Sequence, residues 1–216
     1  MKNYIKNQQT KLKRKRVGNI DVFIKDEIPN FNSVSVIEKV TDLVPNHLLN
    51  YIDTIYIGEF EHLKNRSLDA SYSNGMIFIN NKQQSENDML DDLVHEIAHS
   101  VEEVYTEQIY SDLTLQREFL IKREKLYNLL GSEGFEVENY SFDNVNYDIE
   151  FDRFLYKDVT YAVLRSITSD IFYSPYGATS LREYFANGFE AVFYHKDIKK
   201  LSNISPILLE KIEELL

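Results

Sequence analysis

The 216-residue chain contains no Cys and no Trp, and it has only 7 Gly and 4 Pro. Without Cys there is no thiol nucleophile, no disulfide and no Cys-ligated zinc or iron–sulfur site. No stretch approaches the roughly 18 apolar residues that indicate a membrane-spanning helix, and the N-terminus lacks the apolar segment of a secretory signal. We therefore expect a protein that stays in the cytosol, leaves by a non-classical route, or is already a processed form.

Basic residues are concentrated at the N-terminus, although the net charge of the chain is -11. Seven of the 24 Lys and Arg residues lie within 1–16, which has no acidic residue, so 17 basic residues remain against 35 acidic ones. Such an arm could contact nucleic acid or anionic lipid; the alternative is a solvated, poorly ordered tail. The acidic remainder repels phosphate backbones and favours a basic peptide or protein partner. We expect a flexible arm over 1–18 and a single domain over 19–216.

Hydrophobic periodicity predicts strands in the first part of the chain and helices in the second. Strands are expected at 20–24, 51–57 and 76–79, the last one after a turn at Asn74-Gly75. Helices are expected at 33–44, from Ser85 to about 105, and at 113–130, 151–172, 180–194 and 206–216. This order predicts an α+β fold, with a small N-terminal sheet packed on a helical second half, rather than alternating βαβ units.

The strongest chemical signal is the H-E-x-x-H sequence formed by His95, Glu96 and His99. Four residues advance a helix by about 400°, so the two imidazoles project from nearly the same face. Both can then bind one Zn²⁺ at roughly 2.0–2.1 Å, with Glu96 placed to take a proton from the bound water. The alternative is that these are ordinary surface or core residues of an amphipathic helix.

A catalytic zinc site needs a third protein ligand and one open position. The metzincin continuation fails, because Glu102 and Tyr105 stand where Gly and the third His are required, and His47, His62 and His195 lack a ligand context. A carboxylate on a later helix is the better candidate, and Glu183 supplies one. Asn187, one turn further, could accept a hydrogen bond from a ligand imidazole. Ser180 and Glu183 also read as a helix-capping box, so spacing leaves both roles open.

The chain resembles a known family at these two motifs. HEIAH at 95–99 and SPYGATSLREYFA at 174–186 are similar to the catalytic domain of anthrax lethal factor and its relatives, which include the Pro-Pro endopeptidases. These are gluzincins, zinc metallopeptidases whose third ligand is a Glu on a later helix. The resemblance implies one Zn²⁺ per chain bound by His95, His99 and Glu183, with Glu96 as general base and Tyr176 as hydroxyl donor to the oxyanion.

Comparison with that family indicates two further candidate residues near the metal ligands. Asn187 stands where relatives tend to carry a carboxylate, and Glu190 is the nearest acidic alternative on the same helix face. The interval between His99 and Glu183 is longer than the family leads us to expect, which is consistent with an insertion around residues 132–170.

The predicted activity is zinc-dependent hydrolysis of peptide bonds by Glu-assisted attack of a zinc-bound water. Zincins usually hold an extended substrate against an edge strand, and Met76, Ile77, Phe78 and Ile79 are the candidate for that strand; the alternative is an ordinary core strand. A catalytically inactive binding protein of the same fold is the first rival. The second is an unrelated helical protein, structural or associated with DNA through its basic arm.

Overall fold

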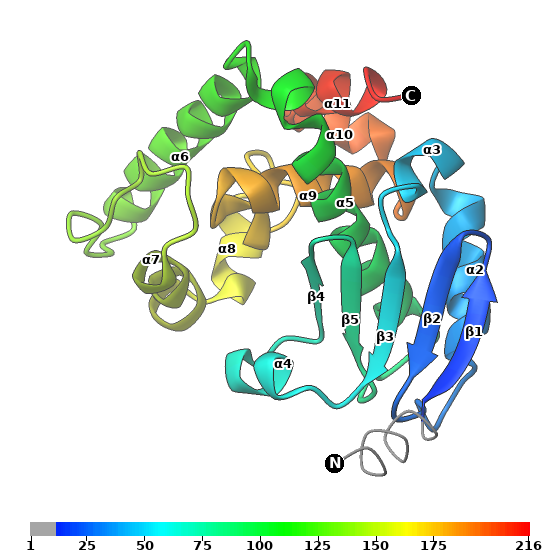
Figure 1. Cartoon of the computed structure of the whole chain (residues 1–216). Coiled ribbons are helices and arrows are strands. Elements are labelled where there is room, and N and C mark those ends of the chain that lie inside the picture. The colour runs from blue at the N-terminus through cyan, green and yellow to red at the C-terminus, as the bar shows by residue number, and fades with distance from the viewer. Residues whose placement is uncertain (1–11) are drawn as a thin grey trace. The chain divides into compact units, whose positions relative to one another are not determined.

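A computed structural model describes residues 12–216 of the chain (Figure 1). The predicted α+β class is confirmed, because a mixed five-stranded sheet in the N-terminal half is followed by a mainly helical C-terminal half. The chain divides into two compact units, Met1–Val104 and Tyr105–Leu216. Within residues 12–216, no helix combines the length and the apolar character needed to cross a membrane.

The first unit is built around the sheet. Its strands lie in the order β1-β2-β3-β5-β4, with β2, β3 and β5 parallel and the two outer strands antiparallel to their neighbours. The strands are β1 (Lys13–Val17), β2 (Ile20–Ile24), β3 (Thr54–Gly58), β4 (Ala70–Ser73) and β5 (Met76–Asn80), and the helices are α2 (Ser33–Leu43), α3 (Asn46–Leu49), α4 (Glu61–Arg66) and the first part of α5 (Glu86–Tyr110).

The sheet has one aliphatic and one aromatic face, because side chains alternate along a strand. Ile and Val side chains of β2, β3 and β5 are buried. Figure 1 shows α2 and α5 behind the strands. On the other face Phe23, Tyr56 and Phe78 stack across three strands, with ring centroids 5.4 and 5.1 Å apart. The Arg14 guanidinium covers the outer side of Phe23, so this row is packed at its β1 end.

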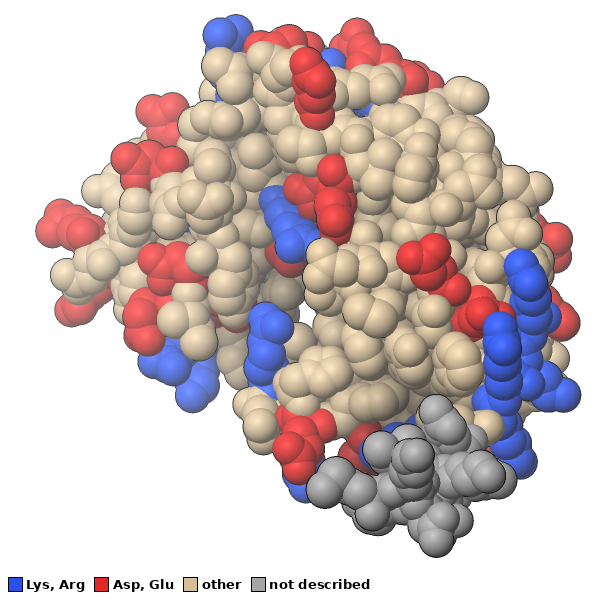
Figure 2. Space-filling view, viewed as in Figure 1, with Lys and Arg blue, Asp and Glu red and all other residues tan. Residues whose placement is uncertain are grey.

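Part of the expected flexible arm belongs to the sheet. Lys13–Val17 pairs with β2 as the edge strand β1, so the prediction of a flexible segment is wrong for these residues. Their basic side chains are exposed and form a blue column in Figure 2. Lys13 binds Glu27 and Arg14 binds Asp21, so acidic neighbours partly balance this charge. Residues 1–11 of the predicted arm lie outside the described residues.

The expected edge position of Met76–Ile79 is also wrong. These residues lie in β5, which is hydrogen-bonded to β3 on one side and to β4 on the other. The error arose because Ala70–Ser73, a short polar segment, carries no apolar alternation and was not expected to form a strand. Among the described strands, β4 is therefore the edge strand at this end of the sheet.

The second unit contains the end of α5 and a set of shorter helices. Residue Tyr105 has non-helical backbone angles and interrupts α5 where this unit begins. The other elements are α6 (Thr114–Ser132), α7 (Ile149–Arg153), a π-helical segment (Phe154–Val159), α8 (Tyr161–Ile167), a 3₁₀ turn (Tyr176–Ala178), α9 (Leu181–Phe193), α10 (Ile198–Ile204) and α11 (Pro206–Glu213). The single helix expected at 151–172 is thus broken, and Thr160 marks the break with φ +72°.

Two charged residues of α6 hold the C-terminal helices of this unit. The Glu118 carboxylate accepts hydrogen bonds from the backbone N–H groups of Ile207 and Leu208 at 3.0 and 3.1 Å, at the start of α11. One turn later, Lys122 donates to the carbonyl of Ile204 at the end of α10. The two side chains therefore satisfy a helix N-terminus and a helix C-terminus with charges of the favourable sign.

The start of α6 is tied to α11 by Asp112, and this contact predicts a pH dependence. The carboxylate accepts from Lys211 Nζ at 2.8 Å and from the N–H and hydroxyl of Thr114. The Lys211 hydrogen bond, followed by those from Thr114, holds the pKa of Asp112 below its usual range. The resulting stabilisation is present above the unfolded pKa, roughly 3.9, and is lost as the pH falls through the folded pKa.

We therefore expect Asp112→Asn to lower the free energy of unfolding at pH 7, with a gap to the wild type that narrows below about pH 4. Urea unfolding at pH 7, 5 and 3 measures this gap. The exposed Asp158 offers a control variant, Asp158→Asn. A gap that stays constant over the whole pH range would contradict the assigned role of the Asp112 charge.

Candidate metal centre

His95 and His99 lie one turn apart on α5 and face each other, as their spacing predicts. Their Nε2 atoms are 3.1 Å apart and their rings are nearly perpendicular, at 89°. His99 is buried and His95 is half-buried. Two atoms that bind one tetrahedral zinc at 2.0–2.1 Å are roughly 3.3 Å apart. The imidazole pair therefore has the separation that a shared metal ion requires.

Glu183 lies in the first turn of α9, and its backbone and side chain have separate partners. Ser180 is the N-cap of this helix, and its hydroxyl accepts a hydrogen bond from the Glu183 N–H at 3.2 Å. The predicted cap is thus present, but it uses the backbone of Glu183. The carboxylate is buried, with the residue only 9% exposed.

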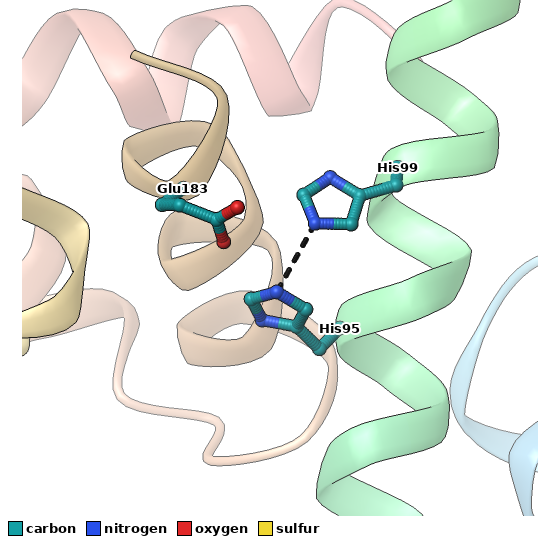
Figure 3. Close-up of side chains that lie close together, drawn as sticks. All are labelled: His95, His99 and Glu183. Carbon is teal, nitrogen blue, oxygen red and sulfur yellow. Dashed lines mark hydrogen bonds between the residues drawn. The ribbon is translucent and has the colours of Figure 1, made fainter. Parts of the chain in front are cut away.

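The Glu183 carboxylate belongs to one group with the two imidazoles (Figure 3). One ligand atom from each of His95, His99 and Glu183 lies within 4.8 Å of the other two. Two imidazole nitrogens and one carboxylate oxygen are a donor set that suits Zn²⁺ and leaves a fourth position for water. The residues present therefore fit a metal ion, and the group could hold one.

Two acidic residues of α5 lie close to these two histidines in the sequence. Glu96 is 7% exposed and follows His95 directly. Glu102 Oε2 lies 3.6 Å from His99 Nδ1, which is too long for a good hydrogen bond but close enough to favour a proton on Nδ1. A proton on Nδ1 leaves the lone pair on Nε2, the atom that faces His95. Glu102 was not among the predicted site residues, although its i+3 spacing from His99 could have indicated this contact.

Tyr176 opens the 3₁₀ turn that precedes α9 and is half-buried. Its backbone carbonyl accepts from the hydroxyl of Thr179 at 2.7 Å. Its ring meets the ring of Tyr161 nearly edge-on, with centroids 6.4 Å apart. Tyr161 in turn donates its hydroxyl to Asp152 at 2.9 Å, so the predicted insertion supplies a neighbour of Tyr176.

Asn187 has different partners from the one predicted for it. Its Oδ1 accepts a hydrogen bond from the hydroxyl of Ser174, and its Nδ2 donates to Glu190 Oε2 at 3.1 Å. The Asn187 acceptor is thus bonded to the loop before α9. Because an amide oxygen has two lone pairs, the hydrogen bond from a ligand imidazole stays a prediction. Glu190 lies on the same helix face and is buried, as its spacing suggested.

An acidic cavity lies beside the N-terminal turns of α5. It is lined by Asp69, Lys82, Gln83, Gln84, Asp88, Asp91 and Asp92. Burial raises the pKa of Asp92 to about 7; the charges of Asp69 and Glu96 act in the same direction, and a hydrogen bond from Gln83 at 2.7 Å opposes them. Four of the seven lining residues are Asp and one is Lys, so the lining is acidic, and the raised pKa leaves the Asp92 carboxyl partly protonated near pH 7. The sequence did not indicate this cavity.

The remaining histidines do not join the His95 group in the described part of the chain. His62 lies 3.3 Å from the Ser71 hydroxyl and packs edge-on against Phe78. Asp91, Glu190 and His195 form a second group with ligand atoms within 4.8 Å of one another. Because His195 is exposed, as predicted, this second group is the weaker candidate for a metal.

In the comparisons with known proteins, no family model matches the chain, and no curated protein or solved structure gave a match. The likeness to gluzincins therefore rests on the motif residues and on the group that they form. That group, His95, His99 and Glu183, is compatible with a zincin and defines a possible metal site.

Proposed function

We propose that the chain is a zinc-dependent metalloendopeptidase of the gluzincin type. The observation that carries this proposal is the buried set of two imidazoles and one carboxylate whose ligand atoms lie within 4.8 Å of one another. The 3.1 Å separation of the two Nε2 atoms supports a single ion bound by both. The resemblance of both motifs to lethal factor and the Pro-Pro endopeptidases supports the same reading.

In this proposal each residue has a defined part in peptide hydrolysis. A zinc ion at the site would act as a Lewis acid and would lower the pKa of water. Glu96 takes a proton from the attacking water and then delivers it to the leaving amine. The Tyr176 hydroxyl donates a hydrogen bond to the oxygen of the substrate carbonyl as negative charge develops there.

We further propose that the substrate is a peptide with basic residues near the scissile bond. An extended chain would pair with the open side of β4 by strand addition. Asp69 directly precedes β4 and also lines the acidic cavity, which supports recognition of Lys or Arg at that end of the strand. The acidic charge of the chain beyond residue 16 supports the same substrate class.

Metal analysis followed by a peptide-library digest tests the proposal. The wild-type chain should bind about one zinc and cleave library peptides, with basic residues enriched near the cleavage positions. His95→Ala should lose both the zinc and the cleavage. A chain without bound zinc, or equal cleavage by His95→Ala, would contradict the proposal. Cleavage without basic enrichment would contradict only the proposed substrate class.

Glu102 gives a separate prediction for metal affinity. Because its carboxylate favours the proton on His99 Nδ1, Glu102→Gln is expected to weaken zinc binding by roughly tenfold, the lower end for a residue that orients a ligand. Competition with a chelator measures the affinity. Glu107→Gln, at an exposed position of the same helix, is the control. An unchanged zinc affinity in Glu102→Gln would show that Glu102 does not orient the imidazole.

A further inference from the structure

The side chain of Asn187 is in contact with the turn that carries Tyr176. Asn187 is only 4% exposed, and its amide has a defined orientation. The carbonyl end accepts from Ser174, two residues before Tyr176, and the amino end donates to Glu190. Since a carboxylate accepts and does not donate, exchanging the two ends of the amide would break the hydrogen bond to Glu190.

The same carbonyl oxygen packs against the residue that follows Tyr176. A Cβ added to Gly177 would lie 2.7 Å from Asn187 Oδ1, which is closer than such atoms can approach. Gly177 is therefore required here for its small size, because it lets the amide approach the backbone. Asn187 thus contacts the chain on both sides of Tyr176, through the Ser174 hydroxyl and through the Gly177 backbone.

The other end of the turn is held independently of Asn187. Arg123 donates to the carbonyl of Ala178 at 2.6 Å, and the Thr179 hydroxyl donates to the carbonyl of Tyr176. The segment between Ser174 and Thr179 therefore has one support from α6 and one from α9. Asn187, the support from α9, contacts the turn at Ser174 and at Gly177, on either side of Tyr176.

We propose that Asn187 is a positioning residue for Tyr176, which holds the turn from both sides and so fixes the position of the phenol hydroxyl. The catalytic consequence rests on the proposed function, in which that hydroxyl meets the developing oxyanion. In this role Asn187 acts through Tyr176 and does not act through the metal ligands. Its loss should lower kcat about tenfold to a hundredfold, as expected for a displacement of about 1 Å in a catalytic group.

A double-mutant cycle on the zinc-loaded full chain tests this coupling, with a peptide found by the library digest. Asn187→Ala should lower kcat with little change in KM or in zinc content. In the Tyr176→Phe background the same substitution should have almost no further effect on kcat, because the hydroxyl that it positions is already absent. An equal fold-loss in both backgrounds, or loss of zinc in Asn187→Ala, would overturn the proposal.

Hydrogen exchange provides a readout that does not depend on activity. The N–H groups of Ala178 and Thr179 donate within the turn, to Pro175 and Tyr176. They should exchange several-fold faster in Asn187→Ala than in the wild type, and unchanged rates would overturn the proposal. If the wild-type chain cleaves no peptide, the proposed function fails, while the exchange rates still decide whether Asn187 holds the turn.

Two further variants keep the test valid if Asn187→Ala does not fold. Ser174→Ala removes one hydroxyl at a half-buried position and should also speed exchange in the turn and lower kcat, by a smaller factor. Asn203→Ala, at an exposed position of α10, is the matched control and should change neither exchange nor kcat. Wild-type exchange rates in the turn together with full activity in Ser174→Ala would show that the Ser174 hydrogen bond does not hold the turn. This result would overturn the proposal.

Discussion

Glu96→Gln is expected to lower kcat for peptide hydrolysis by roughly a thousandfold to ten-thousandfold while the zinc content stays unchanged. Gln has nearly the volume of Glu, but its amide cannot take a proton from water. The expected factor is the upper part of the range for removal of a general base. Turnover of a library-derived peptide and metal analysis of the same preparation measure the two quantities together.

Glu107→Gln is the matched control for this prediction, because it makes the same change at an exposed position of α5. It should retain both zinc and full activity. Near wild-type hydrolysis by Glu96→Gln would contradict the assigned general base. Zinc binding by a wild-type chain that hydrolyses no peptide would instead favour the inactive binding protein.

Arg123→Ala is expected to destabilise the second unit by about 3–5 kcal/mol, which is a large part of the stability of a typical domain. The guanidinium is 1% exposed and donates to the carbonyls of Ala178 and Ser141 at 2.6 and 2.8 Å. It also lies 3.8 Å from the centre of the Phe151 ring. Truncation would leave the carbonyl of the buried Ala178 without the Arg123 donor and would open a cavity beside the ring.

Thermal unfolding should show this loss as a fall in Tm of roughly 10 °C or more. Arg117→Ala, at an exposed position of the same helix, should unfold close to the wild-type temperature. Arg123→Lys should remain well below wild type, because one ammonium group cannot reproduce the guanidinium fork. Burial lowers the pKa of Arg123 to about 10, so the side chain stays charged at pH 7. A Tm of Arg123→Ala within about 2 °C of wild type would contradict this structural role.

The fold class and the helix that carries His95 and His99 could be predicted because both depend on local patterns. Alternating apolar residues predicted the strands observed as β2, β3 and β5. The 3.6-residue period predicted the helix observed as α5, with His95 and His99 on one face. The helix was expected to start at Ser85, and the hydroxyl of this residue accepts a hydrogen bond from the Asp88 N–H at 3.2 Å. Glu183 was found through a motif, because a carboxylate 84 residues after His99 has no local signal.

The errors concern features that depend on pairing between distant segments. β4 has a polar sequence and becomes a strand because it pairs with β5, so the edge of the sheet was assigned to the wrong strand. The basic residues of β1 resemble a solvated tail until they pair with β2. The hydrogen bonds of Asn187 to Ser174 and Glu190 were not predicted, because one helical turn of spacing does not show which neighbouring loop reaches the amide.

By itself, the sequence determined the α+β class, the H-E-x-x-H helix and the candidate ligands, because period, capping and motif spacing are encoded in neighbouring residues. Tertiary structure alone decided the strand order, the use of Asn187 by the Tyr176 turn and the role of Arg123. Arg123 illustrates the reason: its charge predicts exposure, and its burial is stabilised by carbonyls and an aromatic ring from three other segments, together with Phe119 of its own helix.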